Sequence, residues 1–151
     1  MEDDNQMRFT MFLDQIPSGT AQQKRMGYKK DKLTGKQKVV FFDSDSVADA
    51  KRTYMYMLRR YAPRTPLKGP VCLDVAFQYA VKDKKKRGKW KASRPDCDNI
   101  VKVFVDCMTK CGFFEDDNQV CRLTVSKLYS LCDKAAISVS IEEMGNEEND
   151  T

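Results

Sequence analysis

The chain has 151 residues and a mass of 17.4 kDa, enough for one domain with its own hydrophobic core. It contains no histidine, which excludes serine–histidine–aspartate triads, histidine general bases and histidine-ligated metal sites. All 27 Lys and Arg residues lie between residues 7 and 140, where only 14 acidic residues occur, so this span carries a net charge of +13. Such a basic body favours a polyanionic partner, although a solvated lysine-rich surface has the same composition.

The predicted elements follow one another with short connections. Alternating or β-branched apolar residues predict five strands, over 7–13, 38–42, 71–81, 120–129 and 135–141. The last two are predicted to pair across a turn near 131–134. A helical period of apolar residues predicts two helices, over 47–61 and 99–110. The order β-β-α-β-α-β-β predicts an α+β fold: a single domain in which two helices pack against a mixed sheet.

The two ends of the chain are acidic and carry no signal of a core. We therefore predict a flexible acidic lead over 1–6, a folded domain over 7–141 and an acidic tail over 142–151. The start MEDDNQ lacks the basic residues of a signal peptide, and no apolar run is long enough to span a membrane. We expect a cytoplasmic protein with no membrane partner.

Six cysteines are present, but they lack the paired C-x₂-C spacing of a structural zinc site. We predict reduced, mostly buried thiols. The alternative is a zinc-binding interaction module, whose candidate ligands are Cys97, Cys107, Cys111 and Cys121.

Acidic residues flank the second predicted helix on both sides. Asp96 and Asp98 come just before it, and Lys102 follows Asp98 by four residues, which places both on one helical face. After the helix, Asp116 or Asp117 can return to meet the first pair if the helix packs on the next strand. Converging carboxylates repel one another unless a divalent cation binds, and oxygen ligands favour Mg²⁺ or Mn²⁺. The alternative is that the first pair caps the helix and the later acids form a solvated loop.

A basic loop leads directly into this acidic segment. Residues 82–94 hold eight cations and one acid, a net charge of +7. We predict that the loop positions DNA through phosphate contacts, although a run of like charges is also typical of a solvated loop. The candidate DNA-binding residues are Lys84, Lys85, Lys86, Arg87, Lys89, Trp90, Lys91 and Arg94. Trp90 is either a core anchor or a platform that stacks on an unpaired base.

A second basic group lies in the first third of the chain. Residues 20–36 are polar and lysine-rich, with a turn predicted at 33–35. The cations between residues 24 and 38 are predicted to form another phosphate-binding surface.

The acidic segment resembles the RusA family of Holliday-junction resolvases. The resemblance rests on RPDCDN at 94–99, Lys102, Asp106, CGFF at 111–114 and EDDNQV at 115–120. It is strongest over residues 70–144. The chain departs from a minimal member at residues 20–45, which are longer and more basic.

The resemblance implies a homodimeric, Mg²⁺-dependent endonuclease that resolves four-way DNA in recombination and repair, and that needs no nucleotide cofactor. Mn²⁺ is expected to substitute. A non-catalytic DNA-binding or architectural protein is the alternative. The family is commonly encoded by bacteria, phages or prophages.

The resemblance also assigns roles to single residues. The implied metal ligands and catalytic carboxylates are Asp96, Asp98 and Asp117, with Asp116 secondary. Lys102 corresponds to the catalytic lysine. Lys127 stands where the family tends to carry a lysine on the next strand, and it joins the candidate DNA-binding residues.

Overall fold

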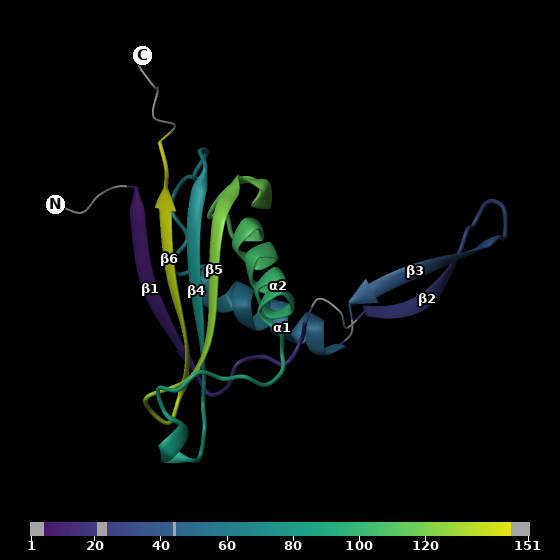
Figure 1. The fold of residues 1–151 in the computed structure, drawn as a ribbon. Coiled ribbons are helices and arrows are strands. Elements are labelled where there is room, and N and C mark those ends of the chain that lie inside the picture. The colour runs from purple at the N-terminus through teal and green to yellow at the C-terminus, as the bar shows by residue number, and fades with distance from the viewer. Residues whose placement is uncertain (1–4, 21–23, 44, 146–151) are drawn as a thin grey trace.

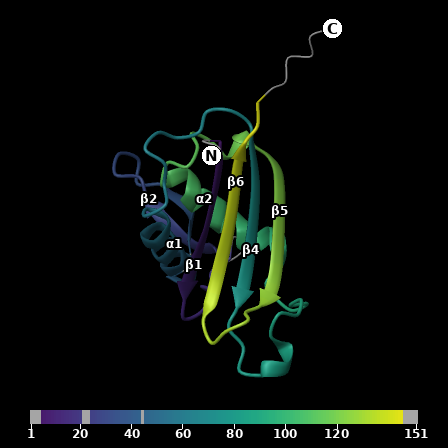
Figure 2. The same cartoon turned by 90° about the vertical axis from the view of Figure 1, so that its left-hand side faces the viewer.

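Two helices pack on the same face of a four-stranded sheet (Figures 1 and 2). The computed structural model describes residues 5–20, 24–43 and 45–145. Across the sheet the strands are β1 (Gln6–Leu13), β6 (Ala135–Glu143), β4 (Val71–Tyr79) and β5 (Val120–Tyr129). The helices are α1 (Asp45–Leu58) and α2 (Cys97–Lys110), and a separate hairpin consists of β2 (Lys24–Lys30) and β3 (Gln37–Asp43). The predicted α+β class, a mixed sheet with two helices, is confirmed.

β4 is a central strand because it pairs on both sides, in parallel with β5 and antiparallel with β6. Its alternate residues Val71, Leu73, Val75 and Phe77 are fully buried, as the alternation of the sequence predicts. Tyr79, predicted on the same face, is only partly buried at the end of the strand.

The predicted pairing of the last two strands is wrong. β4 lies between β5 and β6, so these two are not hydrogen-bonded neighbours. The chain enters β5 from α2, and a strand–helix–strand crossover returns parallel to its first strand, here β4. Burial agrees with this order: β6 buries Ile137 and Ile141 as a central strand does, whereas β5 exposes Arg122 at the edge of the sheet.

Strand β2 is absent from the sequence prediction, which treats residues 20–36 as a polar connection. Lysine is depleted in strands, and these residues show no apolar alternation. β2 becomes a strand only through its pairing with β3, in a register that places Tyr28 opposite Val39 and Lys29 opposite Lys38. The hairpin projects away from the sheet and the helices (Figure 1).

Both helices begin two residues earlier than predicted. α2 begins at Cys97 because the Asp96 carbonyl accepts the first helical bond from the Ile100 N–H, at 3.1 Å. α1 also stops at Leu58 rather than at residue 61, and a turn follows in which the Tyr61 N–H bonds the Leu58 carbonyl at 3.0 Å.

The core is organised around Phe104 of α2. Its ring makes edge-to-face contacts with Tyr54 of α1, at 5.1 Å between ring centroids, and with Phe77 of β4, at 5.6 Å. All three side chains are fully buried. Since one residue contacts both the other helix and the sheet, its burial fixes the rotation of α2 and therefore the direction of its polar face.

The predicted acidic ends are described only in part. Residues 1–4 of the predicted lead and 146–151 of the predicted tail lie outside the described residues, while β1 begins at Gln6 and β6 ends at Glu143. Within the described part, no helix is both long enough and apolar enough to cross a membrane.

Two substitutions in this core are expected to act differently. Phe104→Ala leaves a cavity, so the free energy of unfolding should fall by about 3–5 kcal/mol. Tyr54→Phe removes a buried hydroxyl that has no hydrogen-bond partner within the described residues, so stability should be unchanged or rise by about 1 kcal/mol. Urea unfolding followed by circular dichroism measures both, and a clear loss for Tyr54→Phe would mean that the hydroxyl is bonded in solution.

Candidate active site

A cavity of about 650 Å³ lies between α2 and β5. Asp98, Lys102 and Asp106 line it from α2, and Asp117 and Asn118 line it from the segment that leads into β5. On the helix, successive members of this row are four residues apart, so they share one face and span about 12 Å. The structure therefore brings Asp98, Lys102 and Asp117 to one cavity.

Asp106 was not among the candidate site residues, although it lines the same cavity. Its signal in the sequence was the continued spacing of four residues after Asp98 and Lys102. That spacing alone is equally typical of a solvated helix face, so only the packing of α2 beside Asp117 distinguishes it.

Asp96 occupies the N-cap position of α2, but its carboxylate makes no capping hydrogen bond. The side chain is exposed, and the Asn99 amide lies 3.5 Å from its Oδ2. It borders a neighbouring hollow of about 640 Å³ that Arg94, Asn99 and Tyr79 also line. The structure thus leaves Asp96 beside the cavity that holds the other two carboxylates. A purely structural role as a helix cap does not account for it.

The two acids after the helix differ in their surroundings. Asp116 caps the short 3₁₀ helix η2 (Asp117–Gln119), since its carboxylate accepts the Asn118 N–H at 2.9 Å. This hydrogen bond holds the pKa of Asp116 below its usual range. The pKa of Asp117 is raised, first by its hydrogen bond with Asp116, then by partial desolvation and by the negative charges of Asp116 and Asp106. Asp117 therefore has no capping task, and other carboxylates crowd its charge.

Gln119 locks this acidic turn onto the rest of the domain. Its Oε1 accepts the N–H groups of Glu115 and Asp116 at 2.8 and 2.9 Å. Its Nε2 donates to the carbonyls of Leu67 and Gly69 at 2.8 and 3.0 Å. All the hydrogen-bonding groups of the side chain are used, so the position of Asp117 depends on Gln119.

Two lysines hold the segment just before Asp96. Lys127 of β5 donates from Nζ to the carbonyls of Ser93 and Pro95, at 2.7 and 2.6 Å. Lys91 donates from Nζ to Ser93 Oγ at 2.7 Å and also to the Arg94 carbonyl. Desolvation lowers the pKa of Lys91. Both were candidate DNA-binding residues, and the structure uses them to hold the entry to α2.

The basic loop is fastened to the edge of the sheet. The Gly88 N–H bonds the Tyr129 carbonyl at 2.9 Å, and the Lys91 N–H bonds the Lys127 carbonyl at 3.0 Å. An ion pair of Arg87 with Asp133 adds a second attachment. The loop therefore has a defined path along β5, through the 3₁₀ helix η1 (Lys84–Lys86).

Most cations of this loop point into solvent. The exposed ones among the candidate residues are Lys84, Lys85, Lys86, Lys89 and Arg94. Trp90 forms an isolated bridge with Leu128, and 73% of its surface is exposed. The interpretation of Trp90 as a core anchor is therefore wrong, because β5 offers it only a strand edge.

The donors around the cavity are carboxylate oxygens, which suit a hard divalent cation. Within residues 5–20, 24–43 and 45–145, no three acidic or cysteine side chains stand close enough to hold a metal ion as they are. The proposed zinc ligands Cys97, Cys107, Cys111 and Cys121 do not gather there either.

The cysteines are all free, but the prediction that most are buried is wrong. Only Cys107 is buried, where desolvation raises the pKa of its thiol to about 11. Cys121 and Cys132 are exposed, because they lie on the edge strand and on the turn after it.

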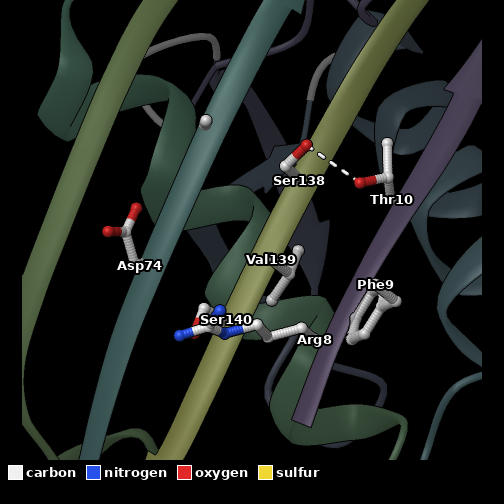
Figure 3. Close-up of a pocket in the computed structure, with 8 residues that line it drawn as sticks. Arg8, Phe9, Thr10, Asp74, Ser138, Val139 and Ser140 are labelled. Carbon is white, nitrogen blue, oxygen red and sulfur yellow. Dashed lines mark hydrogen bonds between the residues drawn. The ribbon is translucent and has the colours of Figure 1, made fainter.

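A further hollow lies on the sheet face opposite the helices (Figure 3). Arg8, Asp74 and Ser140 line it, beside a hydrogen bond of 3.0 Å between the hydroxyls of Thr10 and Ser138. None of the candidate catalytic residues lies there, so the sheet separates it from the acidic cavity.

Two comparisons with known proteins bear on the acidic cavity. Residues 17–142 match the family described as "Endodeoxyribonuclease RusA". A protein of Lactococcus phage r1t, described as "Crossover junction endodeoxyribonuclease rusA", is 35% identical over 136 residues, which cover 90% of this chain and 97% of the phage protein. The family match contains every candidate site residue.

The lock formed by Gln119 yields a stability prediction. Gln119→Glu keeps the shape of the side chain. It replaces the amide NH₂, which donates to two carbonyls, by a carboxylate oxygen that repels them. We expect the free energy of unfolding at pH 7 to fall by about 1–3 kcal/mol. Asp117→Asn is the matched control: it changes an exposed neighbour outside the lock and should shift stability by no more than about 0.5 kcal/mol. Equal effects in urea unfolding would contradict the lock.

Proposed function

The chain belongs to the RusA family of endodeoxyribonucleases, and we propose that it resolves Holliday junctions by metal-dependent hydrolysis of phosphodiester bonds in DNA recombination and repair. One observation carries the link to this chain's own residues. Asp98, Lys102 and Asp117 line one cavity, and a loop of net charge +7 leads into the helix that carries two of them. Two carboxylates and an ammonium group that line one cavity of a basic body suit a site where a cation joins acids to phosphate.

Asp96, Asp98 and Asp117 would hold Mg²⁺, with Mn²⁺ as a substitute and Asp116 in a secondary role. The oxygen chemistry of these donors supports the assignment. Bound there, the ion would polarise the phosphate and make water more acidic. Asp117 suits this role better than Asp116, whose carboxylate already caps η2.

Lys102 would stabilise the negative charge that builds up on the phosphate during hydrolysis. Its side chain is exposed on α2, one turn beyond Asp98 and on the same face. An ammonium group in this place can approach a phosphate only when the DNA reaches the cavity. It is therefore a catalytic residue in this proposal and adds little to general DNA affinity.

The loop 82–94 would position the DNA through its exposed lysines. Lys127 and Lys91 would act chiefly on Asp96, by holding the carbonyls of Ser93, Arg94 and Pro95. The exposed ring of Trp90 is available to stack on a base at the branch point.

We also infer that the protein acts as a homodimer. A four-way junction is resolved by two symmetric cuts, and a two-fold dimer offers two equivalent sites. The relative from a phage supports a phage or prophage origin, and thus action in the bacterial cytoplasm.

Cleavage of a synthetic four-way junction tests the proposed activity. The wild-type protein should cut it with Mg²⁺ and not with EDTA, and should cut a linear duplex of the same sequence far more slowly. Asp96→Asn, Asp98→Asn and Asp117→Asn should each abolish cleavage while the junction is still bound, because a lost ligand charge weakens the metal site and reduces repulsion of phosphate. Lys102→Ala should slow cleavage more than it weakens binding.

Asp116→Asn is the matched control for these variants, since it changes the neighbouring carboxylate and should have a milder effect. A near wild-type rate for Asp117→Asn together with an inactive Asp116→Asn would reverse their roles. Junction binding without cleavage by the wild type, at any Mg²⁺ or Mn²⁺ concentration, would favour an architectural protein.

The basic loop is expected to set the salt dependence of binding. Each lysine that neutralises a phosphate contributes about −0.9 to the slope of log K against log salt on duplex DNA. Replacing Lys84, Lys85 and Lys86 by Ala should therefore flatten the slope by roughly two to three units if all three contact phosphate. An unchanged slope in titrations at several salt concentrations would show that these lysines are only solvated.

A further inference from the structure

The β2–β3 hairpin is the one strand pair in the described residues that has no place in the main sheet. It joins the body beside the start of α1 and extends away from the sheet and the helices (Figure 1). With seven residues in each strand, it is about 23 Å long. The apolar side chains near its tip whose burial the structure describes, Tyr28, Leu33 and Val39, are all exposed, so burial at these positions does not explain the projection.

The hairpin carries a dense positive charge. Between residues 27 and 39 the chain has one acid, Asp31, and five exposed lysines: Lys29, Lys30, Lys32, Lys36 and Lys38. Within the described residues, none of these lysines forms an ion pair.

Asp31 holds the turn at the tip with its carboxylate and offsets only one of the five lysine charges. Asp31 Oδ1 accepts the Leu33 N–H at 2.9 Å, and this bond holds the pKa of Asp31 below its usual range. Its carbonyl accepts the Gly35 N–H at 2.9 Å, where glycine takes a positive φ of 69°. The tip is thus a built turn that presents Lys32 and Lys36 to solvent.

The pairing register adds a sharper signal. Lys29 lies directly opposite Lys38, and like charges at such a position destabilise a strand pair. The next pair toward the body, Tyr28 and Val39, is exposed on the other face. A repulsive pair on a projecting ribbon is explained if an anion lies over it in the working state of the protein.

We propose that the β2–β3 hairpin is a DNA-binding arm that lies along one duplex arm of the junction, outside the region contacted by the cleavage site. The inference rests on the proposed function, because it takes branched DNA as the substrate. A two-stranded ribbon is an element that the major groove of B-DNA admits, and 23 Å corresponds to about seven base pairs. Contact of the hairpin with a second copy of this chain is the alternative outcome, which the oligomeric state of the variants detects.

Arm length is the variable that tests the proposal. Binding is measured in EDTA to four-way junctions whose arms are about 25 or about 8 base pairs long, the shorter leaving little duplex beyond the cleavage region. The wild type should bind the long-armed junction more tightly. Lys29→Ala with Lys38→Ala should lose most of that preference, and its salt slope on the long-armed junction should be flatter by about two.

The matched control is Lys29→Arg with Lys38→Arg, which keeps both charges and should keep the arm-length preference and the slope. Circular dichroism and sedimentation establish that the variants are folded and of wild-type oligomeric state. An Ala variant that retains the full preference and slope overturns the proposal. So does an Ala variant whose only change is a lost dimer, since the hairpin would then contact a second copy.

The design separates this proposal from the proposed function. Binding in EDTA requires no cleavage, so an inactive wild type that still prefers long arms in a Lys29- and Lys38-dependent way would leave the arm intact and refute the nuclease. A wild type that cleaves the junction but binds long and short arms equally well would support the nuclease and refute the DNA-binding arm.

Discussion

The burial of α2 is the constraint on which the rest of the molecule depends. Its inner side is packed between α1 and the sheet, and Phe104 contacts an aromatic ring from each. Rotating the helix would expose this core, at a cost of several kcal/mol for the phenylalanine alone. The same rotation fixes where Asp98, Lys102 and Asp106 point. Packing thus places the side chains of Asp98, Lys102 and Asp106 along the cavity beside β5, and within the described residues none of the three makes a hydrogen bond through its side chain.

The other two acidic positions are supplied by connections rather than by helix packing. Gln119 ties the turn that carries Asp117 to the segment at Leu67 and Gly69. Lys127 ties the entry of α2, and so Asp96, to β5. In both cases one side chain hydrogen-bonds backbone groups of a distant segment. The positions of Asp117 and Asp96 therefore depend on single polar residues, Gln119 and Lys127, that are not carboxylates themselves.

Charge is segregated along the molecule in a way that suits a nuclease of branched DNA. The basic loop is fastened along the edge strand, the acidic cavity opens between that strand and α2, and the lysine-rich hairpin projects elsewhere. The pKa of Asp117 is raised first by its hydrogen bond with Asp116, then by desolvation and by the negative charges of Asp116 and Asp106. The basic loop fastened along β5 counters part of the repulsion that these acids exert on phosphate.

The sequence alone determined the α+β class, the buried face of strand β4, the core face of α2 and the acidic motif, because each rests on local patterns: alternation, helical period and spacing within one segment. The spacing of four residues also placed Asp98 and Lys102 on one face of the helix. Only the tertiary structure decided that β5 lies parallel to β4 with β6 on the other side, since strand partners depend on which edge remains free after α2 has crossed. The hairpin strand β2 exists through pairing and carries no pattern of its own. The sequence also did not predict that Asp116 caps η2, that Lys127 bonds the carbonyls before Asp96, or that Trp90 is exposed. These roles depend on how the elements pack.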